Sequence, residues 1–246
     1  MQPIRIDVES STRTYPVLVS PGLAGELTRW LADTGVGERR FVVSSPNVWK
    51  HHGEMLVAAL PGVEHLLVSD GERAKNHQTL GRIYDWLIES GTDRSSTVIA
   101  IGGGVIGDTV GFAAASYLRG VDLVQVPTTL LAMMDAAIGG KTGVDLAEGK
   151  NLVGAFYQPS FVLEDVQTLR TLPERQLNSG WAEAIKHGLV LDEGLLRTFE
   201  EQGEKIRSLD QKTSTEVIMR SGAVKVDVVS RDERDSLGIR VLLNYG

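Results

Sequence analysis

Two kinds of hydrophobic pattern alternate along the first two-thirds of the chain. Short apolar runs rich in β-branched residues, such as Arg40–Ser44 and Thr97–Ile101, are typical of buried strands. Between them lie longer segments with apolar residues every three or four positions, which predict amphipathic helices. The expected strands are 4–8, 15–19, 40–44, 63–68, 97–101 and 123–126, and the expected helices are 23–31, 48–60, 77–88 and 109–116. This alternation predicts an α/β fold with a parallel sheet covered on both faces.

The pattern changes near residue 166. From Pro173 onward the chain reads almost wholly as helix, over 174–191, 194–201 and 213–229, with no strand-like run of comparable strength. We therefore expect an α/β domain over 1–166 and a helical domain over 167–246. The last residues, 241–246 (VLLNYG), form an apolar run without a polar tail, which is unusual for a natural terminus. We expect the helical domain to be incomplete for this reason.

The composition of the chain excludes several classes of binding partner. A formal net charge of −7 argues against a nucleic acid held by a general positive field, although an anionic small molecule could bind a local cluster of Lys and Arg. The chain has no cysteine, which excludes disulfides and thiolate metal sites. No apolar run reaches ~18 residues and the first residues lack a signal-peptide core, so we expect no membrane contact and a cytoplasmic location.

A glycine-rich turn follows the expected strand 97–101. The segment 102–108 (GGGVIGD) contains G-x-G-x-x-G between a strand and a helix, where glycines let backbone amides approach a pyrophosphate at a helix N-terminus. It does not lie in the first βαβ unit, where the dinucleotide fingerprint usually occurs. Taken alone, the motif is equally compatible with a tight strand-to-helix turn.

A second glycine-rich segment, 139–143 (GGKTG), suggests a phosphate-binding P-loop. That motif requires a glycine where Asp135 stands, so an ATPase is excluded. Lys141 and Lys150, both on turn-rich backbone, are still candidates for binding a phosphate or carboxylate, against the alternative of two solvated surface lysines.

Three further segments carry candidate chemistry. The turn 70–75 (DGERAK) has mixed charge and also fits a solvated helix start. Thr128 and Thr129 follow a strand, where α/β folds place ligand contacts, but they also suit a helix N-cap. One face of a predicted helix carries Glu183, Lys186 and His187. This spacing is compatible with a metal-and-base cluster and equally with an exposed ion pair. The five histidines form no H-x-x-x-H pair, so the residues alone do not assemble a zinc site.

In this order, these segments closely resemble the 3-dehydroquinate synthase family, from the first strand to the last residue. The matching strings are DGERAK (70–75), GGGVIGDTVGFAAASYLRG (102–120), QVPTTLLAMMDAAIGGKTGVD (125–145), GKNLVGAFYQP (149–159), TLRTLP (168–173), WAEAIKHG (181–188) and RVLLNYG (240–246). The last string resembles the segment directly before the family's H-T-x-G-H-A motif, which would supply two histidine metal ligands. The departures are mild: Met133 replaces a polar residue, Ala136 and Ala137 replace serines, and His187 stands where tyrosine is common.

The resemblance implies a Rossmann-like NAD-binding domain and a metal- and substrate-binding helical domain. The implied NAD-site residues are Asp70, Gly71, Glu72, Arg73, Ala74, Lys75, Gly104, Val105, Ile106, Gly107, Asp108, Thr128, Thr129, Lys141, Lys150, Thr168, Leu169, Arg170 and Thr171. Glu183 would be the carboxylate ligand of a divalent metal, zinc or cobalt. Asp135 and Lys141 would lie between NAD and substrate. The implied substrate-binding residues are Lys186, Lys225, Arg240 and Asn244, and Arg119 would reach the substrate phosphate of the neighbouring subunit in a homodimer.

The implied activity is that of a phosphate-eliminating carbon–oxygen lyase of the shikimate pathway to aromatic amino acids. NAD oxidises 3-deoxy-D-arabino-heptulosonate 7-phosphate transiently, phosphate leaves, the ketone is reduced, and an aldol reaction closes the ring to 3-dehydroquinate. The alternatives are another sugar phosphate cyclase such as 2-deoxy-scyllo-inosose synthase, a polyol dehydrogenase of similar fold, and a non-catalytic NAD-binding fragment. Because one ligand does not make a catalytic metal site, we expect no turnover from these 246 residues alone.

Overall fold

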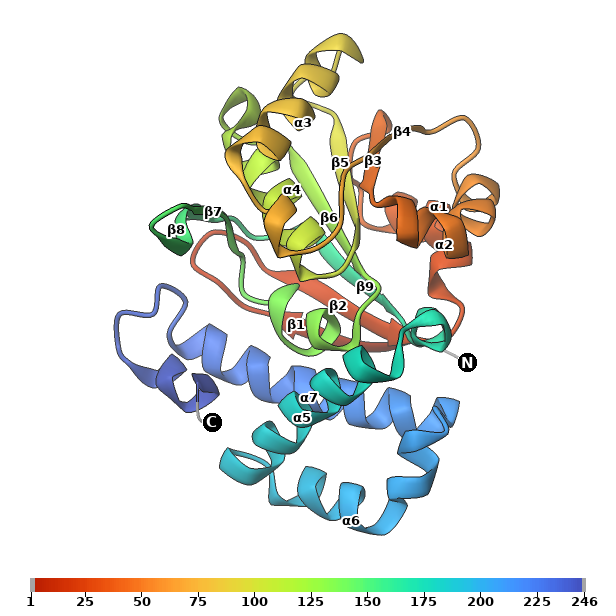
Figure 1. Ribbon diagram of the computed structural model, residues 1–246, viewed down its shortest axis with the longest axis vertical. Helices are drawn as coiled ribbons and strands as arrows, with labels where there is room; N and C mark the ends of the chain where they lie inside the picture. Colours follow the sequence, from red (N-terminus) through yellow and green to blue (C-terminus); the bar gives the residue numbers. More distant parts are fainter. Residues whose placement is uncertain (1–2, 245–246) are drawn as a thin grey trace.

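The computed structural model describes residues 3–244 and builds them around a seven-stranded sheet (Figure 1). The strand order is β1-β2-β9-β6-β5-β3-β4. Its strands are β1 Ile4–Val8, β2 Tyr15–Ser20, β3 Arg40–Ser44, β4 Glu64–Leu67, β5 Thr97–Gly102, β6 Asp122–Pro127 and β9 Phe161–Asp165. Neighbouring strands are parallel, apart from the antiparallel edge pair β1–β2. The expected α/β fold with a mainly parallel sheet is confirmed.

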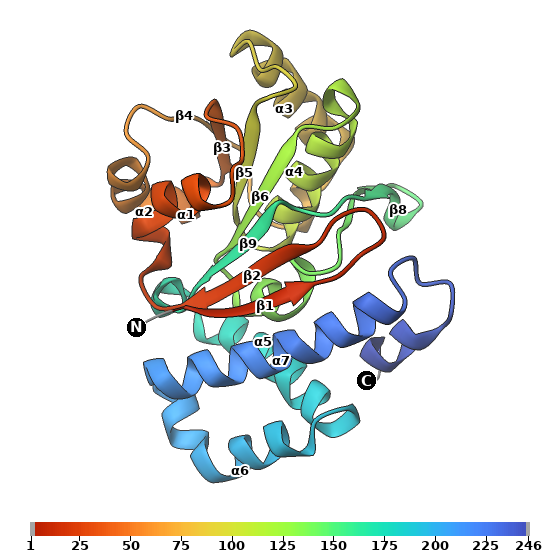
Figure 2. The same ribbon diagram turned by 180° about the vertical axis from the view of Figure 1, so that it is seen from behind.

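Helices cover both faces of this sheet, as expected. One face packs against α1 Leu27–Asp33 and α2 Pro46–Ala59, and the other against α3 His77–Glu89 and α4 Gly104–Ser116. Alternation along β5 explains the two layers: Ile99 belongs to the α1–α2 core, whereas Val98 belongs to the α3–α4 core. Figures 1 and 2 show these helix pairs on opposite sides of the strands.

The chain after Pro173 is helical, as the sequence predicts. The helices are α5 Glu174–Val190, α6 Glu193–Arg207 and α7 Gln211–Arg231, and they cover the β1-β2-β9 end of the sheet (Figure 2). Asp192 and Asp210 cap α6 and α7 by accepting hydrogen bonds from backbone N–H groups. The shared core includes Val17 of β2, Trp181 of α5 and Val229 of α7. Within residues 3–244, no helix is long and apolar enough to cross a membrane.

Several elements differ from the sequence prediction, and the clearest cases are as follows. The glycine-rich segment after residue 139 is an antiparallel hairpin of β7 Lys141–Leu146 and β8 Gly149–Phe156, not a loop. Strand β9 was not predicted, because its apolar run covers only Phe161–Leu163 and is followed by the polar residues Glu164 and Asp165. Helix α4 begins at Gly104, five residues before the predicted start at Thr109, because packing and the following apolar residues overcome the low helix propensity of glycine.

Candidate active site

A cleft of about 560 Å³ opens where the parallel strands end. It is lined by Asn47 and Val48 after β3, Asp70 and Gly71 after β4, Gly103–Ile106 after β5, Thr128 and Thr129 after β6, and Thr171 after β9. Parallel α/β sheets bind ligands at this edge, because the carboxyl ends of the strands and the helix N-termini meet there.

The glycines of this cleft bring its backbone close to the opposite wall. A Cβ atom added to Gly103 would lie 3.0 Å from the Thr129 methyl group, and one on Gly104 would lie 3.2 Å from the Ala136 Cβ. None of the described residues that line the cleft is Lys or Arg. A pyrophosphate held here would therefore depend on backbone N–H groups at the start of α4, a chemistry that fits this glycine-rich helix start.

Eight of the residues expected at the NAD site line this cleft: Asp70, Gly71, Gly104, Val105, Ile106, Thr128, Thr129 and Thr171. The remainder of that set does not line it: Glu72, Arg73, Ala74, Lys75, Gly107, Asp108, Lys141, Lys150, Thr168, Leu169 and Arg170. Thr168 and Leu169 are buried in the structure, whereas Lys150 is exposed and lies 3.0 Å from Glu72.

Lys75 and Asp108 form a buried ion pair beside the cleft. The Lys75 ammonium lies 2.6 Å from the Asp108 carboxylate and also donates to the Asn151 side-chain carbonyl. Burial raises the pKa of Asp108 to about 6, although Lys75 acts in the opposite direction. This pair joins the turn 70–75 and α4 to the β7–β8 hairpin, and so supports the geometry around the cleft.

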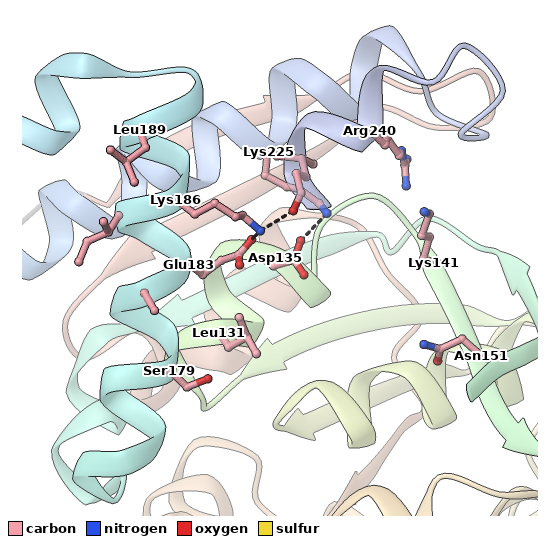
Figure 3. Close-up of a pocket in the computed structure, with 13 residues that line it drawn as sticks. Leu131, Asp135, Lys141, Asn151, Ser179, Glu183, Lys186, Leu189, Lys225 and Arg240 are labelled. Carbon is pink, nitrogen blue, oxygen red and sulfur yellow. Dashed lines mark hydrogen bonds and ion pairs between the residues drawn. The ribbon is translucent and has the colours of Figure 1, made fainter. Parts of the chain in front are cut away.

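A second cavity, of about 900 Å³, lies between α5, α7 and the β7–β8 hairpin (Figure 3). Three of the expected substrate-binding residues line it, namely Lys186, Lys225 and Arg240. The expected metal ligand Glu183 also lines it, as do Asp135 and Lys141, which were expected between NAD and substrate. An adjoining cavity of about 530 Å³ shares Asp135, Lys141 and Lys225 with it and is also lined by Asp108 and Ala136. Ala136 faces Gly104, so the two cavities lie next to the 560 Å³ cleft at the strand ends, which is the nucleotide-type cleft of this fold.

The large cavity has a local excess of positive charge. Four cationic side chains and two carboxylates line it, a surplus of two positive charges in a chain whose net charge is −7. Lys225 pairs with Asp135, Lys186 lies 2.5 Å from Glu183, and Lys141 lies 2.6 Å from Asp235. Such a cluster suits a small molecule with several negative charges.

Arg240 is held differently from these lysines. Its guanidinium donates to the backbone carbonyls of Asp232 and Glu233, at 2.7 and 2.6 Å, and lies 5.9 Å from the centre of the Phe156 ring. Burial lowers its pKa, and nearby carboxylates oppose that effect. No carboxylate of the described residues forms an ion pair with it, and the side chain lines the cavity although it is only 3% exposed.

Glu183 is a half-buried carboxylate at the α5 wall of the cavity. Burial disfavours its ionisation, but the nearby His187 and Lys186 side chains outweigh burial and hold its pKa below the ordinary value. The residues 3–244 contain no group of three or more His, Cys, Asp or Glu side chains suited to a metal ion. Glu183 therefore fits a single carboxylate ligand, and the described residues do not form a complete site.

One predicted residue, Arg119, lies apart from the cavity. Arg119 is exposed on a turn in which Leu118, Arg119 and Gly120 all have positive φ, at 50°, 69° and 126°. It does not line the cavity of its own chain. Asn244 ends the last 3-10 helix, Ile239–Asn244, but its side chain lies outside the described part of the structure.

Reasoning from the residues missed several residues that line these cavities. Asn151 borders both cavities next to Lys141, and asparagine suits its left-handed backbone, with φ at 57°. Asn47 and His52 border the nucleotide-type cleft, where His52 lies 3.0 Å from the Thr171 hydroxyl. Asn47 could have been found from its position just after a predicted strand, where α/β folds place ligand contacts. Nothing in the sequence indicates that His52 lies beside Thr171.

A glycine-rich helix start beside a cation-rich cavity is typical of an enzyme that binds a nucleotide cofactor and an anionic small molecule. Residues 65–179 match the family model "3-dehydroquinate synthase N-terminal", and residues 180–246 match "3-dehydroquinate synthase C-terminal". The 3-dehydroquinate synthase of Acaryochloris marina is 44% identical over all of this chain and 69% of its own length. That of Geotalea uraniireducens is 47% identical over 98% of this chain and 68% of its own length. The chain belongs to the 3-dehydroquinate synthase family.

Solved structures of related cyclases share this fold. The 2-epi-5-epi-valiolone synthase of Streptomyces hygroscopicus subsp. jinggangensis, with NAD⁺ and Zn²⁺ bound, matches with a TM-score of 0.86 and 34% identity over 98% of this chain and 68% of that chain. A 2-deoxy-scyllo-inosose synthase in complex with carbaglucose-6-phosphate, NAD⁺ and Co²⁺ matches with a TM-score of 0.81 and 25% identity over 97% and 66% of the two chains. The chain thus spans about two thirds of the length of its relatives.

Proposed function

We propose that this chain provides the cofactor and substrate sites of a 3-dehydroquinate synthase, which converts 3-deoxy-D-arabino-heptulosonate 7-phosphate to 3-dehydroquinate and phosphate. The observation that carries the proposal is the convergence of Lys141, Lys186, Lys225 and Arg240 on one cavity. Family membership and the adjacent nucleotide-type cleft support it.

The strand-end cleft is proposed to hold NAD. The N-terminal N–H groups of α4 would bind its pyrophosphate, and Thr128 and Thr129 would line the opposite wall. NAD, when bound, takes up a hydride and gives it back, so one molecule serves repeated turnovers. Asp135 and Lys141 border the cavity next to this cleft, which would place them between cofactor and substrate.

The cationic side chains are proposed to bind the substrate's phosphate and carboxylate. Lys225 and Lys186 are already held in place by Asp135 and Glu183, so little side-chain entropy remains to be lost on binding. Glu183 would contribute one carboxylate to a divalent metal, zinc or cobalt, which supplies Lewis-acid polarisation of a substrate oxygen. Because the described residues group no further ligands with Glu183, the absence of turnover by these residues alone remains our prediction.

We also propose that the protein acts as a homodimer in which Arg119 serves the neighbouring active site. Arg119 is exposed and lies on a turn of three successive left-handed residues. Such backbone costs of order 1–3 kcal/mol per non-glycine residue and is retained mainly where function requires it. A cytoplasmic location also remains a prediction.

Other sugar phosphate cyclases are the main alternative, since two of them share the fold at 34% and 25% identity. Substrate binding separates these activities, because we expect no turnover from these residues alone. Calorimetry with the NAD⁺-saturated protein would compare 3-deoxy-D-arabino-heptulosonate 7-phosphate with glucose 6-phosphate, and binding of glucose 6-phosphate alone would reject the proposal. A polyol dehydrogenase instead predicts tighter binding of an uncharged polyol than of either sugar phosphate.

A further inference from the structure

Asp232 is a buried carboxylate at the point where α7 ends and the chain turns back toward the large cavity. It directly follows α7, and its backbone N–H donates to the Val228 carbonyl at 3.0 Å. Its side chain does not line the cavity, whereas Arg240, eight positions later, does. A buried carboxylate is costly unless hydrogen bonds compensate it, so the partners of Asp232 indicate its role.

The Asp232 side chain binds the backbone of the loop that follows it. Oδ1 accepts hydrogen bonds from the N–H groups of Ser236 and Leu237, at 2.8 and 3.1 Å, and Oδ2 accepts one from Ile239, at 3.0 Å. Burial alone would raise the pKa of this carboxyl, but these backbone N–H groups hold its pKa below the ordinary value. Charge-assisted hydrogen bonds from an ionised carboxylate therefore hold the loop 233–239 against the end of α7.

The Arg240 side chain is attached to the same turn. Its Nε donates to the Asp232 backbone carbonyl at 2.7 Å, and its Nη2 donates to the Glu233 carbonyl at 2.6 Å. Nη1 donates to no described residue, and Figure 3 shows the guanidinium directed toward Lys141. A guanidinium has five N–H donors, so Arg240 can use two of them to fix its orientation and offer others to a ligand.

The two sets of contacts hold Arg240 from both ends. The Asp232 carboxylate fixes the backbone just before Arg240, and the Asp232 carbonyl fixes its guanidinium. We propose that Asp232 is a positioning residue that holds the Arg240 guanidinium in the cavity wall, and this rests on the substrate-binding role proposed for Arg240. Because the contacts exist before a ligand binds, Arg240 loses little side-chain freedom when it binds an anion.

Asparagine is the most informative replacement of Asp232, because it keeps the size of the side chain but not its acceptors. The amide oxygen can accept from part of the loop, but the NH₂ group is a donor and must face a remaining backbone N–H. We therefore expect Asp232→Asn to loosen the loop and the Arg240 side chain. Asp227→Asn is the matched control, because Asp227 is an exposed α7 carboxylate that pairs with Arg231.

The first measurement needs no ligand. In the folded protein, the Nε–H proton of Arg240 should exchange slowly with water, because it is buried and hydrogen-bonded. NMR would follow this proton, assigned by its loss in Arg240→Gln, and Asp232→Asn should speed its exchange whereas Asp227→Asn should not. Fast exchange in the unsubstituted protein, or a rate that Asp232→Asn leaves unchanged, would overturn the positioning role.

The second measurement is a double-mutant cycle on the affinity of the NAD⁺-saturated protein for 3-deoxy-D-arabino-heptulosonate 7-phosphate. Asp232→Asn should weaken binding about tenfold in the wild-type background and far less in Arg240→Gln, because residues that act as a unit are not additive. The affinity for NAD⁺ should stay unchanged. Equal losses of substrate affinity in the two backgrounds would show that Asp232 does not act through Arg240.

The two measurements distinguish the positioning role from the proposed function. If Arg240 exchange depends on Asp232 but the unsubstituted protein shows no saturable binding of the sugar phosphate, the positioning role is supported and the proposed substrate is rejected. If Asp232→Asn does not fold, Arg240 exchange is compared between the unsubstituted protein and Asp232→Glu, which keeps the charge but changes the reach of the carboxylate. Faster exchange in Asp232→Glu would support the positioning role, and equal rates would overturn it.

Discussion

Lys225 on α7 forms an ion pair with Asp135, which lies 90 positions earlier in the π-helix Ala132–Ala136. The lysine side chain is 10% exposed and the aspartate side chain 35%. The pair connects α7 to the π-helix that follows β6. Both residues line the large cavity and the adjoining one. It therefore places a buried positive charge where the proposed substrate and cofactor sites meet.

Replacing this lysine should weaken substrate binding and spare the cofactor. A hydrogen bond to a charged group contributes about 1.5–3 kcal/mol, so Lys225→Gln should reduce affinity for the sugar phosphate about 10–100-fold. Calorimetry with substrate and with NAD⁺ would measure both affinities. Lys212→Gln, at an exposed position on the same helix, is the control. Equal losses of substrate and NAD⁺ affinity in Lys225→Gln would point to general unfolding instead of a local role.

Gly104→Val should abolish NAD⁺ binding. A side chain here would meet Ala136, whose Cβ is 3.2 Å from the position of an added Cβ, and would keep a pyrophosphate from the α4 N-terminus. Gly81→Val is the matched control, since nothing lies within 4 Å of an added Cβ on that α3 residue. Fluorescence or calorimetric titration with NAD⁺ measures the effect. If the folded Gly104→Val protein bound NAD⁺ as tightly as the wild type, the cofactor site would not be at the start of α4.

Glu164 on β9 should make stability depend on pH. Its carboxyl is fully buried, and burial raises its pKa well above the ordinary value. The folded state then keeps a proton that the unfolded state has lost, so this residue's contribution to stability falls as pH rises above the unfolded pKa of about 4.3. Relative to Glu164→Gln, the wild type should lose about 1.4 kcal/mol per pH unit until the folded pKa is reached. Urea unfolding between about pH 5 and 7 tests this, and parallel stability curves for the two proteins would refute it.

Arg119 should act across the proposed dimer interface. Arg119→Ala and Lys225→Gln homodimers should each bind the sugar phosphate weakly, for different reasons. After subunit exchange, a mixed dimer has one site with both residues intact, so part of the tight binding should return. Calorimetry on the exchanged mixture, with each variant alone as control, provides the measurement. If verified mixed dimers bind no better than the parents, Arg119 does not serve the neighbouring site.

The sequence predicted most of the main sheet and its helices, because burying one face of a strand or helix gives its apolar residues a regular spacing. The β7–β8 hairpin was missed because its glycines look like loop residues. In the structure, added Cβ atoms on Gly143 and Gly154 would lie 2.6 and 2.0 Å from backbone oxygens of the opposite strand, so close pairing requires glycine. Strand β9 was missed because its two acidic residues are buried; Asp165 is compensated by the N–H groups of Gly22 and Ala24.

The candidate site was less accessible to sequence reasoning than the fold. Local spacing placed Glu183, Lys186 and His187 on one helix face, and the structure confirms that these side chains contact each other. Spacing does not reveal contacts between distant segments, such as Lys225 with Asp135 or Ser221 with His187. The family resemblance identified Lys225 and Asp135 as site residues. Only the structure shows that Ser221 contacts His187.

Binding of 3-deoxy-D-arabino-heptulosonate 7-phosphate to the NAD⁺-saturated protein tests the central claim most directly. Calorimetry should show saturable binding that weakens in Arg240→Gln, because this variant removes the cavity's one cation that has no carboxylate partner among the described residues. Glucose 6-phosphate, which lacks a carboxylate, should bind more weakly. A folded, NAD⁺-bound protein that shows no saturable binding of the heptulosonate phosphate, or that binds glucose 6-phosphate more tightly, would contradict the account.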